Sequence, residues 1–63
     1  MSIDLRTRYN EWLMSAQGAV RNGDKRAAMF CLGQAMSLAN RVRDTRYRRA
    51  VMRAMNHVRA IGC

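Results

Sequence analysis

Apolar positions recur along the chain in three stripes, each with the three- and four-residue steps of a single helix face. The first stripe is Leu5, Tyr9, Trp12, Leu13, Ala16, Ala19 and Val20; the second is Ala28, Cys31, Leu32, Ala35, Leu38, Ala39 and Val42; the third is Tyr47, Val51, Ala54, Met55, Val58 and Ile61. Proline is absent, and strong helix formers are abundant. The pattern predicts a single small all-α domain, residues 1–63, with helices near 3–21, 24–42 and 45–61.

The boundary between the first two helices is marked by the turn sequence Asn22-Gly23-Asp24. Gly23 can take the left-handed conformation that ends a helix, and Asp24 can cap the next one. At the start of the first helix, we expect Ser2 as the N-cap and Asp4 in the positive field of the helix end. A turn this short predicts an antiparallel helical hairpin.

The boundary between the second and third helices is less defined, because no glycine or proline enforces it. Val42 and Val51 are nine residues apart, which places them on opposite faces of a continuous helix. Either the chain breaks near Asp44-Thr45, or one long helix presents two apolar faces to two partners. A cap at Asp44 or Thr45 favours the break, which yields a helical hairpin followed by a third, C-terminal helix.

The middle helix has features that bear on packing. Met29, Phe30 and Met36 widen its stripe, which predicts burial on more than one side. Gly33 costs about 1 kcal/mol relative to alanine inside a helix, and such a residue indicates close approach of a second backbone. A chain this short buries little surface alone, so we expect a homodimeric helical bundle. The predicted core or dimer interface is Trp12, Leu13, Cys31, Leu32, Ala35, Leu38, Val51, Met55 and Val58.

The chain offers little material for catalysis, so no catalytic, cofactor-binding or metal-binding residue is predicted. Three of its four carboxylates, Asp4, Asp24 and Asp44, stand at expected helix starts, where capping accounts for them. His57 is isolated, and no Cys/His cluster has the spacing of zinc ligands. No apolar run approaches the roughly 20 residues that span a bilayer, and no signal-like segment opens the chain. We expect a non-enzymatic cytoplasmic protein.

The net charge is +8, carried by eleven arginines and one lysine. The planar arginine fork suits phosphate or carboxylate, and arginines are concentrated in RVRDTRYRR, residues 41–49. The predicted partner-binding basic face is Arg41, Arg43, Arg46, Arg49 and Arg53. Three interpretations remain open: this face contacts nucleic-acid phosphates, it binds an acidic protein, or it is merely solvated. Methionines at the stripe edges, Met14, Met29 and Met52, favour a protein interface.

From MSIDLRTRYNEWL to AMNHVRAIGC, the chain resembles the 63-residue open-reading-frame proteins of the exo-xis region of lambdoid bacteriophages. The resemblance rests on overall sequence and length, without a diagnostic motif or a defined site. It implies an early phage protein made in the host cytoplasm, where it favours lytic development or alters host physiology. The preferred hypothesis is a regulatory adaptor that binds a host or phage protein. The alternative is a small nucleic-acid-binding protein that contacts phosphates through its third helix.

Overall fold

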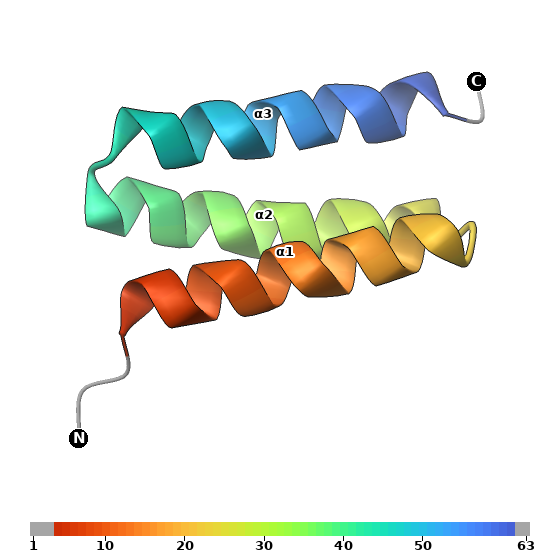
Figure 1. Ribbon diagram of the computed structural model, residues 1–63. Helices are drawn as coiled ribbons and strands as arrows, with labels where there is room; N and C mark the ends of the chain where they lie inside the picture. Colours follow the sequence, from red (N-terminus) through yellow and green to blue (C-terminus); the bar gives the residue numbers. More distant parts are fainter. Residues whose placement is uncertain (1–3, 62–63) are drawn as a thin grey trace.

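The computed structural model describes residues 4–61, which form three α-helices joined by two tight turns (Figure 1). Helix α1 is Leu5–Arg21, α2 is Lys25–Val42 and α3 is Thr45–Ala60. These bounds differ by one or two residues at most from the predicted ones, and the all-α class is confirmed.

Each helix begins after an aspartate whose side chain accepts a hydrogen bond from a backbone N–H. Asp4 Oδ1 accepts from Arg6 at 3.0 Å, Asp24 Oδ1 from Ala27 at 3.1 Å, and Asp44 Oδ1 from Arg46 at 2.9 Å. The N-cap of α1 is therefore Asp4; Ser2, predicted in that role, lies outside the described residues. Three of the four acidic side chains therefore cap helices, and the fourth is Glu11.

The two turns reverse the chain by the same device, a residue with positive φ followed by a capping aspartate. Gly23 has φ +74°, and the N–H of Asp24 donates to the Ala19 carbonyl at 2.8 Å. At the second turn Arg43 has φ 59°, and Asp44 is extended. The chain therefore breaks between α2 and α3, and the alternative of one long helix is wrong.

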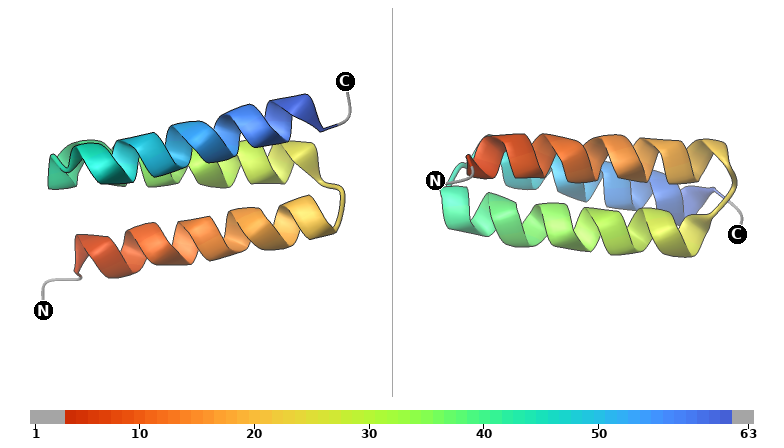
Figure 2. Two further views of the ribbon diagram at one scale, coloured as in Figure 1. Left: turned by 45° about the horizontal axis from the view of Figure 1, so that its top comes forward. Right: turned by 90° about the horizontal axis from the view of Figure 1, so that it is seen from below.

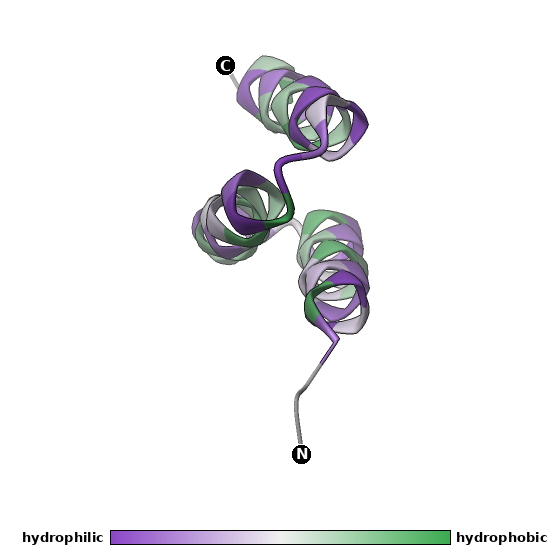
Figure 3. Ribbon diagram, turned by 90° about the vertical axis from the view of Figure 1, so that its left-hand side faces the viewer, coloured by the Kyte–Doolittle hydropathy of each residue, from purple (hydrophilic) through white to green (hydrophobic). Residues whose placement is uncertain are grey.

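Helix α2 is the central element, because it packs directly against both α1 and α3. The outer helices run in the same direction on either side of it (Figure 2). Seen along the helices, α1 and α3 diverge from α2 in a shallow V (Figure 3), and the Cα atoms span 39 × 22 × 12 Å. The prediction that the middle helix is buried on two sides is confirmed, although Phe30, expected to share in this burial, is 61% exposed.

The core is small and rich in alanine. Its buried residues are Tyr9, Ala16, Ala28, Cys31, Leu32, Ala35, Ala39, Val51 and Val58, of which Leu32 and Val51 are the largest fully buried side chains. Full burial of a large aliphatic side chain contributes about 1.5–3 kcal/mol, and an alanine contributes much less. A core of this composition leaves the isolated chain with a small margin of stability.

A pair of tyrosines, here called the tyrosine clasp, joins α1 to α3 near their N-terminal ends. The rings of Tyr9 and Tyr47 stack with centroids 4.6 Å apart, and the Tyr9 hydroxyl donates to the Tyr47 carbonyl oxygen at 3.0 Å. Burial raises the pKa of Tyr9, and the nearby charges of Tyr47 and Asp44 act in the same direction. The clasp joins the outer helices near their N-terminal ends.

Gly33 does not face a second backbone. A Cβ built at this position meets nothing within 4 Å, so the predicted close approach is wrong. The glycine simply leaves α2 with a weaker helix former at an open position.

Two glycine substitutions should therefore change stability in opposite directions. Gly33→Ala is expected to raise the free energy of unfolding by about 0.5–1 kcal/mol, because it adds helix propensity without a clash. Gly23→Ala is expected to lower it by about 1 kcal/mol, since its φ of +74° strains any side chain. Urea unfolding followed by circular dichroism measures both. Shifts of the same sign would contradict this account.

Candidate functional site

Helix α3 carries the densest positive charge, with five arginines and no acidic residue within Thr45–Ala60. Its buried residues, Val51 and Val58, face α2 and the core. Arg46, Arg49 and Arg53 are exposed on the side away from them. This side of α3 therefore offers cationic forks to a partner without a neighbouring carboxylate on the same helix.

Arg46 differs from the other two because it also binds the cap of its own helix. Its guanidinium contacts Asp44 at 3.3 Å, although its side chain is 88% exposed. Hydrogen bonds from Arg46 hold the pKa of Asp44 below its ordinary value of 3.8, and the charge of Arg6 adds to this effect. The lowered pKa means that Asp44 stabilises the fold above its ordinary pKa and loses this contribution as pH falls through the folded-state value.

The five predicted arginines come from two helices and the turn between them. Arg41 lies near the end of α2, where it lines a hollow of about 410 Å³ with Arg8 and Trp12. Arg43 lies in the turn, with a positive φ of 59°. The other three, Arg46, Arg49 and Arg53, lie on α3, and the binding role of all five stays a prediction.

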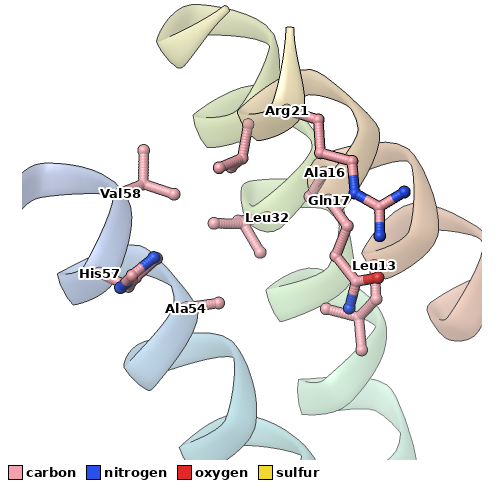
Figure 4. Close-up of a pocket in the computed structure, with 9 residues that line it drawn as sticks. Leu13, Ala16, Gln17, Arg21, Leu32, Ala54, His57 and Val58 are labelled. Carbon is pink, nitrogen blue, oxygen red and sulfur yellow. The ribbon is translucent and has the colours of Figure 1, made fainter. Parts of the chain in front are cut away.

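A groove lies between the C-terminal halves of α1 and α3, and we call it the α1–α3 groove (Figure 4). It measures about 380 Å³ and has α2 as its floor. Its apolar lining is Leu13, Ala16, Val20, Leu32, Ala54 and Val58. Gln17 and Arg21 line it from α1, and His57 lines it from α3. Both outer helices rest on α2, and the groove follows the tyrosine clasp in the direction of the C-terminal ends of α1 and α3.

The apolar surface of the groove continues to the end of α3. A smaller hollow of about 40 Å³ shares Val20 and Val58 with it and reaches Ile61, which is 46% exposed. This groove was not predicted from the sequence. The sequence feature that corresponds to it is a pair of small residues, Ala16 on α1 and Ala54 on α3. They are 38 residues apart, the same separation as the two tyrosines of the clasp.

A second apolar surface, here called the outer aromatic face, lies on the α1–α2 hairpin. Trp12 and Phe30 meet edge to face with ring centroids 6.0 Å apart and planes at 74°. Leu5 and Leu38 line one part of the adjoining hollow with Trp12, and its remaining lining residues are polar: Arg8, Gln34, Ser37 and Arg41. The face therefore presents an exposed aromatic ring, Phe30, and a hollow with a mixed apolar and basic lining.

The structure sorts the predicted core and interface residues into two groups. Cys31, Leu32, Ala35, Val51 and Val58 are buried, and Trp12, Leu13, Leu38 and Met55 are partly buried around them. Cys31 is a free thiol. Among the methionines proposed for an interface, Met14 is 70% exposed and Met52 is also exposed, whereas Met29 packs against the core. Met52 lines a hollow between α2 and α3 with Arg48, on the side of α3 opposite the groove.

Within residues 4–61 there is no group of three His, Cys, Asp or Glu side chains arranged to hold a metal ion. No helix in that part of the chain has the length and apolar character needed to cross a membrane. Comparisons with protein-family models, characterised proteins and solved structures find no match to this chain.

Proposed function

We propose that this protein is a small non-enzymatic adaptor that binds a partner protein through the exposed arginines of α3 and the adjoining groove. The observation that carries the proposal is the meeting of two surfaces: an arginine-rich helix without carboxylates and an apolar groove beside it. An acidic protein surface with apolar anchors complements both. A phosphate backbone complements the charge alone.

The resemblance to the exo-xis-region proteins supplies the biological setting of the proposal. On that basis the protein is an early bacteriophage product that acts in the host cytoplasm. Its partner is a host or phage protein, and binding favours lytic development or alters host physiology.

Nucleic-acid binding is the second candidate function. It is supported by the net charge of +8 and by the absence of acidic residues within α3. Counterion release makes such binding strongly salt-dependent, with losses of about a thousandfold or more between 50 and 200 mM salt for six to ten phosphate contacts. Binding that survives this range favours the protein partner.

We also propose that the protein is a homodimer, assembled through the outer aromatic face. The thin core supports this, because two large fully buried side chains leave the single chain marginal. The shape of the face supports it too, since in a two-fold interface each Phe30 meets the partner's hollow beside Trp12. The groove lies between α1 and α3 and stays open in such a dimer.

The adaptor function is tested by exchanging Arg46, Arg49 and Arg53 together for glutamine. We expect the thermal midpoint to stay within a few degrees, because exposed side chains contribute little to stability. We expect the variant to lose the partners that the wild type captures from host lysate. The matched control exchanges Arg6, Arg26 and Arg48 for glutamine. These three exposed cations line neither the groove nor the hollow of the outer aromatic face, so the control variant should retain the partners.

Nuclease treatment of the lysate separates the two candidate functions. Partners that survive nuclease support the adaptor, and partners that disappear support nucleic-acid binding. If the triple α3 variant captures the same proteins as the wild type, the arginines are a solvated surface and the adaptor proposal is wrong.

A further inference from the structure

We infer that the α1–α3 groove binds one amphipathic helix of the partner, with an apolar stripe flanked by acidic residues. The inference rests on the proposed function and specifies the structural class of the partner segment. It is carried by the shape of the groove, the size of its lining side chains and the charge of its rims.

The shape of the groove matches a helix. Two parallel helices resting on a third leave open the place that a fourth helix occupies in a four-helix bundle. In Figure 4, Leu32 rises from α2 at the floor, and Ala54 and Val58 point into the groove from α3. The small side chains of Ala16 and Ala54 leave room at mid-height for large side chains from an incoming helix.

The length of the apolar lining sets the number of anchors. From Leu13 to Val20 the α1 wall extends seven residues, or about 10 Å at 1.5 Å per residue. This distance corresponds to two helical turns. A helix lying in the groove therefore contributes apolar side chains at positions i, i+3 or i+4, and i+7.

The rims of the groove select for acidic flanks. Arg21 lies on the α1 rim and His57 on the α3 rim. Arg53 precedes His57 by one turn on the same side of α3. No carboxylate is among the residues that line the groove in the described chain. An incoming helix with glutamates or aspartates beside its apolar stripe meets opposite charge on both sides.

The same charges argue against a second copy of this chain as the occupant. Each copy carries +8, and three of its four carboxylates are engaged as helix caps. A helix of one copy placed in the groove of another would bring its own basic side chains close to Arg21 and Arg53, and these like charges repel. A nucleic acid satisfies the rims but presents no apolar stripe to Leu32 and Ala54.

The test uses a dye-labelled helical peptide of about 14 residues, or four turns, with leucines at i, i+3 and i+7 and glutamates on both flanks. A peptide with lysines in place of the glutamates is the matched probe. Fluorescence anisotropy measures binding to the full-length protein. We expect the glutamate peptide to bind at least about tenfold more tightly than the lysine peptide, through the charge complementarity of the rims.

Two pairs of variants locate the binding. Ala54→Leu fills the groove and should weaken the glutamate peptide about tenfold or more, as expected for loss of a central apolar site. Ala60→Leu adds the same atoms at an exposed position of α3 and should have no effect. Arg53→Glu should weaken binding, whereas Arg48→Glu makes the same charge change on the opposite side of α3 and should weaken it much less. Circular dichroism verifies that each variant is folded.

Several results would overturn the inference. They are failure of the glutamate peptide to bind, equal binding to Ala54→Leu, or equal binding of the lysine peptide. Self-association that Ala54→Leu abolishes would assign the groove to a second copy. If a labelled DNA duplex binds the protein, the peptide does not, and Arg53→Glu abolishes binding of the duplex, the surface is a nucleic-acid site.

Lysate capture separates this inference from the proposed function. If Ala54→Leu keeps the partners that the triple glutamine variant loses, the groove is not the docking site and this inference fails, whereas the arginines of α3 remain the partner-binding surface of the adaptor. If both variants keep them, both proposals fail.

Discussion

Replacing Tyr9 with alanine is expected to lower the free energy of unfolding by about 3–5 kcal/mol, the usual cost of removing a buried aromatic ring. Tyr9 is 4% exposed, stacks on Tyr47 and donates to its carbonyl oxygen. The substitution removes the clasp that joins α1 to α3. For a chain with so small a core, a loss of this size approaches the whole stability of the fold. Thermal and urea unfolding followed by circular dichroism measure it.

Tyr9→Phe is the matched control for the clasp. It keeps the stacked ring and removes the hydroxyl hydrogen bond, so the expected loss is about 1 kcal/mol. The difference between the two variants reports the contribution of the ring. If Tyr9→Ala unfolds at the wild-type urea concentration, the clasp is not closed in solution and the relative placement of α1 and α3 is wrong.

Phe30→Lys is expected to convert the protein from a dimer to a monomer. Phe30 is the most exposed aromatic side chain of the outer aromatic face, at 61%, and lysine in its place removes the ring and puts a positive charge against a hollow that Arg8 and Arg41 line. Loss of a central aromatic anchor typically costs 2 kcal/mol or more, which weakens association about thirtyfold. Sedimentation equilibrium from about 1 to 100 µM, spanning ordinary dimer affinities, should show twice the 7.2 kDa chain mass for the wild type.

Met14→Lys is the control for this substitution. Met14 is 70% exposed on α1, outside the hollow that Trp12 and Leu38 line, and the variant should remain a dimer. A wild-type protein that remains a folded monomer at tens of micromolar would refute the homodimer. Equal dissociation of both variants would refute the outer aromatic face as the interface.

The two expected results share one physical cause. Four of the nine buried residues are alanines, which allow close helix packing but bury little apolar area each. Larger apolar side chains lie on the surface instead, at Phe30, Met14, Met52 and Ile61. A chain that places its apolar area in this way is stabilised by whatever covers that surface, which is the physical basis of both the dimer and the adaptor proposal.

The sequence by itself determined the elements, because the interactions that set them are local. Apolar steps of three and four residues predicted three helices, and Asp24 and Gly23 predicted the first turn. Hydrogen bonds and backbone dihedrals within a few residues carry this information. The same logic offered Asp44 or Thr45 as a cap and favoured the correct break, and Asp44 is the cap in the structure. The arginine with positive φ that precedes it gave no sequence signal for the turn.

The tertiary structure decided how the helices are placed and rotated against one another. It brought Tyr9 to Tyr47 across 38 residues, opened the groove between α1 and α3, and turned Phe30 outward. It also placed Arg41 beside Arg8 and Trp12 in the hollow between α1 and α2. A stripe specifies which face of a helix is apolar, but not which neighbour covers it or how completely. Which neighbour covers a face depends on packing between residues distant in sequence. The small side chains of an alanine-rich central helix allow neighbouring helices to pack against it at more than one angle.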